Sequence, residues 1–453
     1  MKAIAKMLRA TMVAGIIFTG FNLFAQNLKV APNQLYHEIK SLANREYPSL
    51  EQLYKHLHAN PELSLHEEKT SARIAEELRK TGFMVTTGIG KFGVVGVMKN
   101  GNGPTVLVRT DLDALPITEN TGLEYASKVC VKDDQGNEVG VMHACGHDIH
   151  MTSFIGTARL LSQLKDKWRG TLVFIGQPAE ERGGGARAML ADGLYTKFPK
   201  PDYCVAWHVA AEIPAGTVGY CEGYALANVN SVDLTIRGVG GHGAYPHTTK
   251  DPIVIAAQTI MALQTIVSRE IKPIDPAVVT VGSIHGGTKH NIIPDEVHLQ
   301  LTVRSYSDAT KEQTLRAIER ICKGIAIAAG VPEDRMPIMT VLDEFTPSTY
   351  NDPALMKKMT ASMKAILGAD KVITKEPVMG GEDFGEYGRT EHKIPIAIFW
   401  LGTVQPERVE HSLHGGEPLP SLHSSQFAPL PEPTIKTGVT AMTAAVLDLL
   451  GGK

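Results

Sequence analysis

The spacing of hydrophobic residues predicts a core in which helices and strands alternate. Apolar residues at helical spacing predict two helices within residues 48–82 and a third over residues 152–164. Continuous apolar runs at 105–109 and 170–176 predict strands that are buried on both faces. The fold class is therefore α/β, with a mainly parallel central sheet flanked by helices.

The middle of the chain predicts a second, smaller unit. Strand and helix patterns follow one another in the order strand–helix–strand–strand–helix–strand, which is the ferredoxin-like (βαββαβ) pattern. The expected segments are 230–237, 252–268, 277–284, 296–304, 310–329 and 338–342. Helix–strand alternation then resumes. We therefore expect a discontinuous catalytic domain, residues 26–224 and 344–453, with an inserted domain at 225–343.

The first 25 residues have the pattern of a secretory signal. Three basic residues precede an apolar stretch at 11–24, which ends at the small residue Ala25. The alternative is an uncleaved anchor helix, but the stretch is short compared with the roughly 20 residues that a membrane span needs. No other segment is expected to cross a bilayer. We expect an exported protein, periplasmic or secreted, without stable membrane insertion after cleavage.

Composition limits the classes of partner. The 453 residues, 43% hydrophobic and 21% charged, are typical of a soluble globular protein with two or three domains. Forty-five basic and 48 acidic residues give a net charge of −3, so nothing indicates a nucleic acid as partner. Five cysteines, an odd number at wide spacing, do not favour a disulfide framework.

Potential metal ligands are concentrated in residues 142–150. This stretch holds Cys145, three histidines that include His147, and one aspartate. Thiolate and imidazole suit Zn²⁺, and a carboxylate widens the choice to Mn²⁺. The alternative is a Cys145 nucleophile activated by His147. Side chains two positions apart on a turn generally diverge, which favours a shared metal instead.

Further polar residues follow predicted strands. Glu180 and Glu181 can divide two tasks, one binding metal and the other moving protons, although a solvated acidic pair is the alternative. Asp111 and Asp113 either cap a turn or orient a ligand imidazole. His208 follows a predicted short strand, and on its own would more often be a core histidine. Ligand sites of open α/β sheets form beyond the carboxyl ends of the strands, so these side chains could converge.

The inserted domain contributes two more candidates. A glycine-rich loop at 238–247 presents His242, because glycines let an imidazole and backbone N–H groups approach a ligand closely. Downstream, Asn291 offers an amide that could bind a carbonyl or a developing oxyanion. The alternative for both stretches is an ordinary tight hairpin loop.

Taken together, these motifs resemble the zinc-peptidase/aminoacylase superfamily of metal-dependent amidohydrolases. The most similar branch contains hippurate hydrolases, N-acyl-amino-acid amidohydrolases and plant indole-acetyl-amino-acid hydrolases. The resemblance extends over most of the chain beyond the signal, at residues 57–64, 109–116, 143–150, 177–181, 207–209, 240–247, 379–384 and 422–424.

The resemblance implies two divalent metal ions per subunit, Zn²⁺ or Mn²⁺. The ligands would be Cys145, His147, Glu181, His208 and His423. His411 and His414 are the alternatives to His423 as the C-terminal ligand.

The resemblance also implies roles for the remaining residues. Glu180 would be the general base, and His242 would stabilise the tetrahedral intermediate in the site of a partner subunit. Asn291 and Arg304 would hold the carbonyl or carboxylate of the substrate. The inserted domain would act as a lid and form a homodimer.

The predicted function is a metal-dependent amidohydrolase. It would cleave the amide bond of N-acyl or N-aroyl amino acids by attack of metal-activated water. A dipeptidase or carboxypeptidase on the same scaffold would differ only in substrate. A catalytically silent binding homologue and a cysteine hydrolase are the remaining alternatives.

Overall fold

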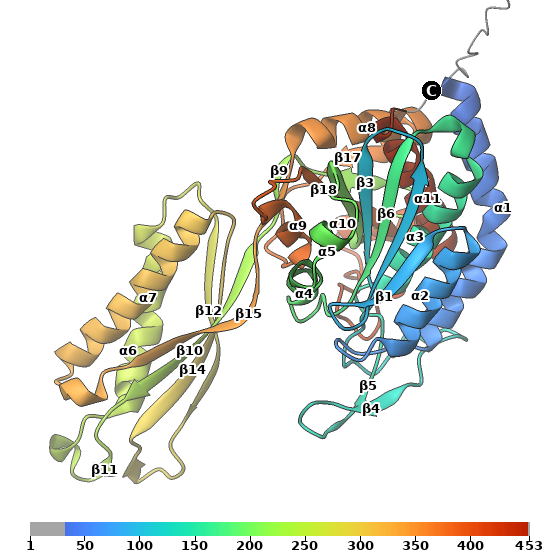
Figure 1. The fold of residues 1–453 in the computed structure, drawn as a ribbon. Coiled ribbons are helices and arrows are strands. Elements are labelled where there is room, and N and C mark those ends of the chain that lie inside the picture. Colours follow the sequence, from blue (N-terminus) through green and yellow to red (C-terminus); the bar gives the residue numbers. More distant parts are fainter. Residues whose placement is uncertain (1–31, 452–453) are drawn as a thin grey trace, which may run out of the picture.

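A computed structural model describes residues 32–451, which form two bodies (Figure 1). The larger body is built on an eight-stranded sheet in the order β1-β2-β6-β3-β7-β18-β8-β17. The pairs β6–β3, β3–β7 and β7–β18 at its centre are parallel, whereas β1–β2, β2–β6 and β18–β8 are antiparallel. The strands are Met84–Ile89, Gly93–Asn100, Gly170–Gln177, Thr105–Asp111, Tyr203–Pro214, Ile396–Val404, Val218–Tyr220 and Val372–Thr374, in sheet order.

Helices cover both faces of this sheet, as an α/β fold requires. One face packs against five long helices, whose buried side chains Phe154, Met359 and Val439 share a core with Phe174 of the sheet. These helices are α1 Pro32–Ala59, α2 Glu68–Lys80, α3 His147–Gln163, α8 Pro353–Leu367 and α11 Pro431–Leu449. The other face packs against the short helices α4 Gly185–Ala191, α5 Leu194–Lys197 and α9 Glu386–Arg389.

The smaller body has the element order β10–α6–β12–β14–α7–β15. Its four strands are antiparallel and lie in the order β12-β14-β10-β15. Helix α6 connects β10 to β12 across β14, and helix α7 connects β14 to β15 across β10. This is the arrangement of the ferredoxin-like fold. The elements are Asn228–Arg237, Pro252–Thr265, Ala277–Gly286, Glu296–Ser305, Asp308–Ala328 and Ile338–Thr346.

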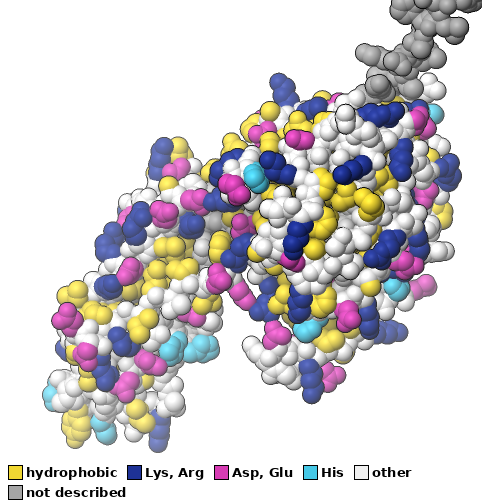
Figure 2. All heavy atoms as spheres, in the orientation of Figure 1, with side chains coloured by type: hydrophobic (Ala, Val, Ile, Leu, Met, Phe, Trp, Pro, Cys, Tyr) yellow, Lys and Arg dark blue, Asp and Glu magenta, His cyan; other side chains and the backbone are white. Residues whose placement is uncertain are grey.

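The chain leaves the larger body and returns to it at one place. Strand β9, Gly223–Leu226, pairs with strand β16, Thr349–Asn351, so the outgoing and returning segments lie side by side. Figure 2 shows an open hollow between the two bodies on one side of this junction.

Several predicted elements were wrong in their limits; helix α3, for example, begins at His147 and not at residue 152. Helix α1 begins at Pro32 and contains Pro48, the predicted start of the helical pattern. Ile39 and Ala43 are buried upstream of Pro48, so the apolar face continues through the proline. Strand β7 runs to Pro214 because β18 pairs with it along most of its length, and His208 therefore lies within a strand instead of after one.

The sequence predicted a signal peptide at residues 1–25 and no other segment able to cross a membrane. The signal peptide at residues 1–25 lies outside the described residues. Within the described part of the chain, Pro252–Glu270 is long and apolar enough to count as a candidate span by length and composition, contrary to the expectation of none. This is weak evidence, because core helices pass the same test. Here the helix packs on the four-stranded sheet through Ile255, Ala256 and Leu263.

Candidate metal centre

The carboxyl ends of the central strands bring the predicted ligands together. Strand β3 ends at Asp111, and β6 ends three residues before Glu180. Helix α3 begins at His147, and β7 carries His208. A cavity of about 700 Å³ opens at this edge of the sheet. The predicted site residues that line it are Cys145, Glu180, Glu181, His208, Arg304 and His423.

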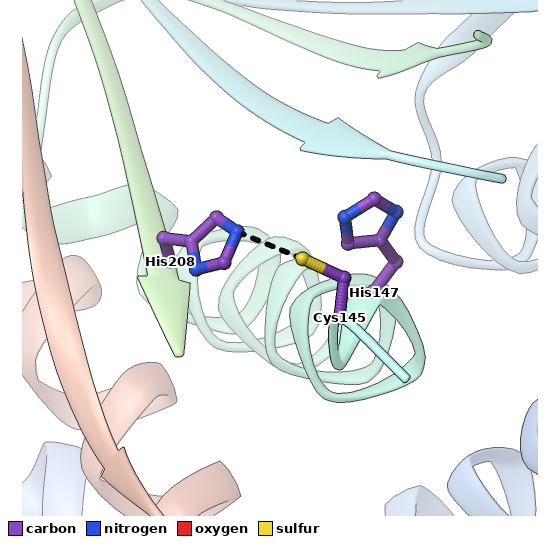
Figure 3. A group of neighbouring side chains, drawn as sticks. All are labelled: Cys145, His147 and His208. Carbon is purple, nitrogen blue, oxygen red and sulfur yellow. Dashed lines mark hydrogen bonds between the residues drawn. The ribbon is translucent and has the colours of Figure 1, made fainter. Parts of the chain in front are cut away.

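Cys145 lies at the centre of the cluster. Its Sγ is 3.4 Å from Nε2 of His208 (Figure 3) and 3.3 Å from Nε2 of His423. The ligand atoms of Cys145, His147 and His208 all lie within 4.8 Å of one another, and so do those of Cys145, Glu181 and His423. The thiol belongs to both groups, so its sulfur would be shared if each group held a cation.

His147 and Glu181 direct unpaired atoms into the same space. Nε2 of His147 is 3.7 Å from Oε1 of Glu181 and 3.9 Å from Oε2 of Glu180. Neither His147 Nε2 nor Glu181 Oε1 has a hydrogen-bond partner among the described residues, although both are buried. Buried polar atoms without partners are costly, and a bound cation would satisfy both.

Backbone carbonyls fix the orientation of two imidazoles. Nδ1 of His147 donates to the carbonyl of Asp113 at 2.8 Å, and Nδ1 of His208 donates to the carbonyl of Val209 at 2.7 Å. In a neutral imidazole the other nitrogen then carries the lone pair, so both Nε2 atoms present lone pairs to the cluster. Such hydrogen bonds are typical of metal-ligating histidines.

The two aspartates have different partners. The carboxylate of Asp113 accepts hydrogen bonds from Oγ of Ser64 at 2.6 Å and from the N–H of Glu181 at 3.0 Å. Its Oδ1 is also 3.4 Å from Nδ1 of His147. Asp113 thus sits against an expected ligand. Asp111 instead accepts from Nδ1 of His150 at 2.8 Å, and Nε2 of that ring accepts from a backbone N–H. Asp111 thus hydrogen-bonds an imidazole outside the expected ligand set, and its Oδ2 also lies 3.6 Å from Nε2 of the expected ligand His147.

Sequence reasoning missed a buried ionic network beneath the site. Arg109, fully enclosed in β3, donates to Asp111 at 2.8 Å, to Glu382 at 2.8 Å and to Asp383 at 3.2 Å. Its Nε donates to Gln177 at 2.9 Å. The signal was available, because an arginine inside an otherwise apolar strand must be paired with acidic groups.

Burial and neighbouring charges raise the pKa of several side chains in the cluster. Burial, together with Glu181 and Glu180, raises the pKa of Cys145 well above its ordinary value. Burial also raises the pKa of Glu181 to about 7. Burial lowers the pKa of His147, but Asp111 and Asp113 outweigh it and raise that pKa to about 10. Protons thus compete for the atoms that would bind metal, so metal affinity is expected to fall as the pH falls.

The residues fit a pair of divalent cations. The set combines one thiol, three imidazoles and a carboxylate, which are ligands of Zn²⁺ and, in part, of Mn²⁺. Two of the imidazoles are oriented by backbone carbonyls, and one nitrogen and one carboxylate oxygen have no partner in the described part of the chain. The residues that could hold the ions are Cys145, His147, Glu181, His208 and His423.

The structure brings His423, not His411 or His414, to the cluster. His411 lies on α10, Pro406–Leu413, and His414 follows it, with Nδ1 donating to the carbonyl of Glu410. Both side chains are exposed. His423 lies further along, where its N–H donates to the carbonyl of Ala144 at 3.0 Å, next to Cys145.

His242 and Asn291 lie together, but away from the cluster. They belong to the paired two-residue strands β11, Gly241–His242, and β13, Ile292–Ile293, and to the adjoining turn. β11 is at the end of the smaller body remote from the junction (Figure 1). Neither residue is among those that line the cavity. Arg304 of β14 does line it, and its Nη1 donates to the carbonyl of Met379 at 2.6 Å.

Comparison with known proteins identifies the family. Residues 107–417 match the family described as Peptidase family M20/M25/M40. The chain belongs to this family. It is therefore a hydrolase of peptidase family M20/M25/M40, as the sequence motifs predicted.

Individual relatives cover most of the chain. Thermostable carboxypeptidase 1 of Saccharolobus solfataricus is 36% identical over 394 residues, which is 86% of this chain and 92% of that protein. Hippurate hydrolase of Campylobacter jejuni is 38% identical over 340 residues, 74% of this chain and 84% of that protein. The YXEP protein of Bacillus subtilis, described as a dinuclear metal binding peptidase of the M20 family, matches with a TM-score of 0.72 at 30% identity. The structural match covers 91% of this chain and 100% of the chain in that structure.

Proposed function

We propose that this member of peptidase family M20/M25/M40 hydrolyses the amide bond of N-acyl or N-aroyl amino acids. The observation that carries the proposal is the division between two adjacent glutamates. Both line the cavity, but Glu181 lies 3.7 Å from each of His147 and His423, whereas Glu180 lies 3.9 Å from His147 and is not paired with His423. One carboxylate thus binds metal while its neighbour is left to move protons.

Each residue of the site then has one task. Cys145, His147, Glu181, His208 and His423 would hold two divalent ions. When bound, these ions lower the pKa of a water molecule and polarise the scissile carbonyl. Glu180 takes the proton from that water and passes it to the leaving amine. Arg304, on the wall of the cavity, binds the carboxylate of the amino acid portion.

Burial supports Glu180 as the proton carrier. Burial, Glu382 and Glu181 raise the pKa of Glu180 well above its ordinary value. A carboxylate with a raised pKa is a stronger base, and its acid form is a ready donor to the departing nitrogen.

Replacing Glu180 with glutamine tests the proposal. We expect kcat on hippurate to fall by about 10²- to 10⁴-fold, because proton transfer is lost, while two metal ions per subunit are retained. Metal content is measured by inductively coupled plasma mass spectrometry. Glu410→Gln, at an exposed position of α10, is the matched control and changes neither quantity. Normal turnover of the Glu180→Gln enzyme would exclude the base assignment.

The second candidate is a dipeptidase or carboxypeptidase on the same scaffold. The position of Arg304 on the cavity wall supports this candidate as well as the first, because the free carboxylate of a peptide would bind the same guanidinium. Comparing kcat/KM for hippurate, other N-acyl amino acids and simple dipeptides separates the two. A metal assay with turnover of any of these substrates excludes a silent binding homologue. Loss of turnover on chelation excludes a cysteine hydrolase.

We also propose that the smaller body is a lid that forms a homodimer. Helix α6 leaves Val254 and Met261 exposed, with Met261 71% accessible, although the helix is strongly apolar. The neighbouring strand β12 is a sheet edge with unpaired backbone groups on one side. A two-fold contact would cover both features. It also gives two residues of the smaller body a role: His242 would stabilise the tetrahedral intermediate in the partner's site, and Asn291 would hold the carbonyl or carboxylate of the substrate.

Export is proposed from residues 1–25. The basic, apolar and small-residue segments supply the signal, and the mature chain would begin at Gln26. The mass of the protein recovered from outside the cytoplasm tests this, and an intact Met1 would contradict it.

A further inference from the structure

Three buried carboxylates hold the loop that carries Glu180 and Glu181. The N–H of Glu181 donates to Asp113 at 3.0 Å, and the N–H of Ala186 donates to Asp383 at 3.0 Å. The N–H of Ala179 donates to Oε1 of Glu67 at 2.7 Å. Asp113 also faces His147, and Asp383 also faces Arg109. Glu67 contacts neither of those groups.

Glu67 comes from a distant part of the chain. It is fully buried and directly precedes helix α2, yet its side chain makes no hydrogen bond that caps that helix. A buried carboxyl is costly unless it has a specific partner, and here the side-chain bond goes to a loop 112 positions away. A local role in starting α2 does not account for its burial.

Ala179 needs to be held. Its φ of +48° lies in the left-handed region, which non-glycine residues adopt at a cost. The turn continues tightly, because the carbonyl of Ala179 accepts from Gly185 at 3.2 Å and that of Glu180 accepts from Gly183 at 2.7 Å. The N–H that Glu67 accepts belongs to the peptide between Pro178 and Ala179, so Glu67 holds the peptide on the N-terminal side of the strained residue. Ala179 directly precedes Glu180, and its backbone conformation therefore sets the direction in which the Glu180 side chain leaves the turn.

We propose that Glu67 is a positioning residue for the general base: by accepting the N–H of Ala179, it keeps the strained turn that directs Glu180 into the cavity. This inference rests on the proposed function. It assigns a role to a residue remote in sequence from the cluster, and it predicts that the hydrogen-bond acceptor, rather than the negative charge, is what matters.

The variants Glu67→Ala and Glu67→Gln separate these properties. Glu67→Ala removes the acceptor, and we expect kcat to fall about 10- to 100-fold with KM and metal content close to wild type. Glu67→Gln keeps an acceptor oxygen, and we expect most of kcat to remain. Glu68→Ala is the matched control, because Glu68 is adjacent and exposed. Thermal unfolding of every variant is measured in parallel.

A second change tests the strain itself. Glycine adopts positive φ freely, so Glu67→Ala combined with Ala179→Gly should recover part of the lost kcat. A purely structural role of Glu67 would not produce this recovery. If Glu67→Ala does not fold, Glu67→Gln and the double variant still give the answer.

Amide exchange provides a readout that does not depend on activity. Followed by mass spectrometry, exchange over residues 178–185 should be faster in Glu67→Ala than in wild type or Glu67→Gln. Faster exchange together with an inactive wild-type enzyme would uphold the positioning role and refute the proposed function. Wild-type kcat in Glu67→Ala, or equal damage from alanine and glutamine, would overturn the positioning role.

Discussion

His58 is a buried imidazole held between two carboxylates behind the metal cluster. Its Nδ1 is 2.6 Å from Asp148 and its Nε2 is 3.0 Å from Glu119. Burial lowers the pKa of His58, but hydrogen bonds to Asp148 and Glu119 outweigh it and raise that pKa to about 10. Asp148 follows His147 in the first turn of α3, so the buried group of His58, Asp148 and Glu119 stabilises that turn.

The raised pKa of His58 predicts how stability depends on pH. The folded protein binds this proton more tightly than the unfolded chain, whose histidine pKa is about 6.5. The stabilisation is therefore fully present below about pH 6.5 and is lost as the pH rises towards 10. We expect His58→Gln to lose about 3–5 kcal/mol in the free energy of unfolding at pH 6, because two buried carboxylates lose their cation. Urea unfolding of wild type and His58→Gln at pH 6 and pH 10 measures this loss. The same loss at both pH values would contradict the prediction.

At the residue scale, the sequence predicted which side chains come together, but not the residues that support them. The side chains of Cys145, His147, Glu181, His208 and His423 do lie together. Glu67 had no signal of its own. One glutamate among several near the start of a helix looks like an ordinary surface residue, and its partner Ala179 is distant in the sequence.

At the scale of elements, α3 is positioned by an unusually close contact with α11. A Cβ added at Gly156 of α3 would lie 2.4 Å from Cγ2 of Val439 and 2.9 Å from Cδ1 of Leu50. On the facing helix, a Cβ at Gly438 would lie 2.9 Å from Oγ of Ser153. Glycines on both helices thus let them approach. Because α3 begins with His147, this contact helps to set the position of one proposed metal ligand.

Overpacking this contact should destabilise the protein. We expect Gly156→Val to lower the free energy of unfolding by about 1–3 kcal/mol, because even the Cβ of the added side chain has no space. Gly324→Ala in α7 is the control, since nothing lies within 4 Å of the added Cβ. It should raise stability by about 0.5–1 kcal/mol through helix propensity. Chemical denaturation measures both, and a neutral Gly156→Val would contradict the close packing.

Element types were predictable from periodicity, whereas element limits depended on partners. The apolar runs at 105–109 and 170–176 are strands β3 and β6. Strand β7 continues past His208 because β18 supplies hydrogen bonds along most of its length, and no local pattern reveals that partner. The short strands β8 and β17 were missed because three residues carry too little periodicity.

At the scale of the whole molecule, the proposed homodimer makes α6 a test site. Met261→Glu would place a charge in the proposed apolar contact, and we expect a shift from dimer to monomer in size-exclusion chromatography with light scattering. Met84→Glu is the control, because Met84 is 68% exposed on β1 of the larger body. If His242 acts across the interface, kcat falls with dissociation. A dimer that survives Met261→Glu with full activity would contradict the arrangement.

The paired strands β9 and β16 make the smaller body an excisable module. Gly223 faces Asn351 and Tyr224 faces Tyr350 across this ladder, so the two ends of the insertion are within hydrogen-bonding reach of each other. A short reverse turn could bridge them in place of residues 228–346 without stretching the remaining backbone. The larger body would therefore keep a continuous, closed chain even with the appendage removed.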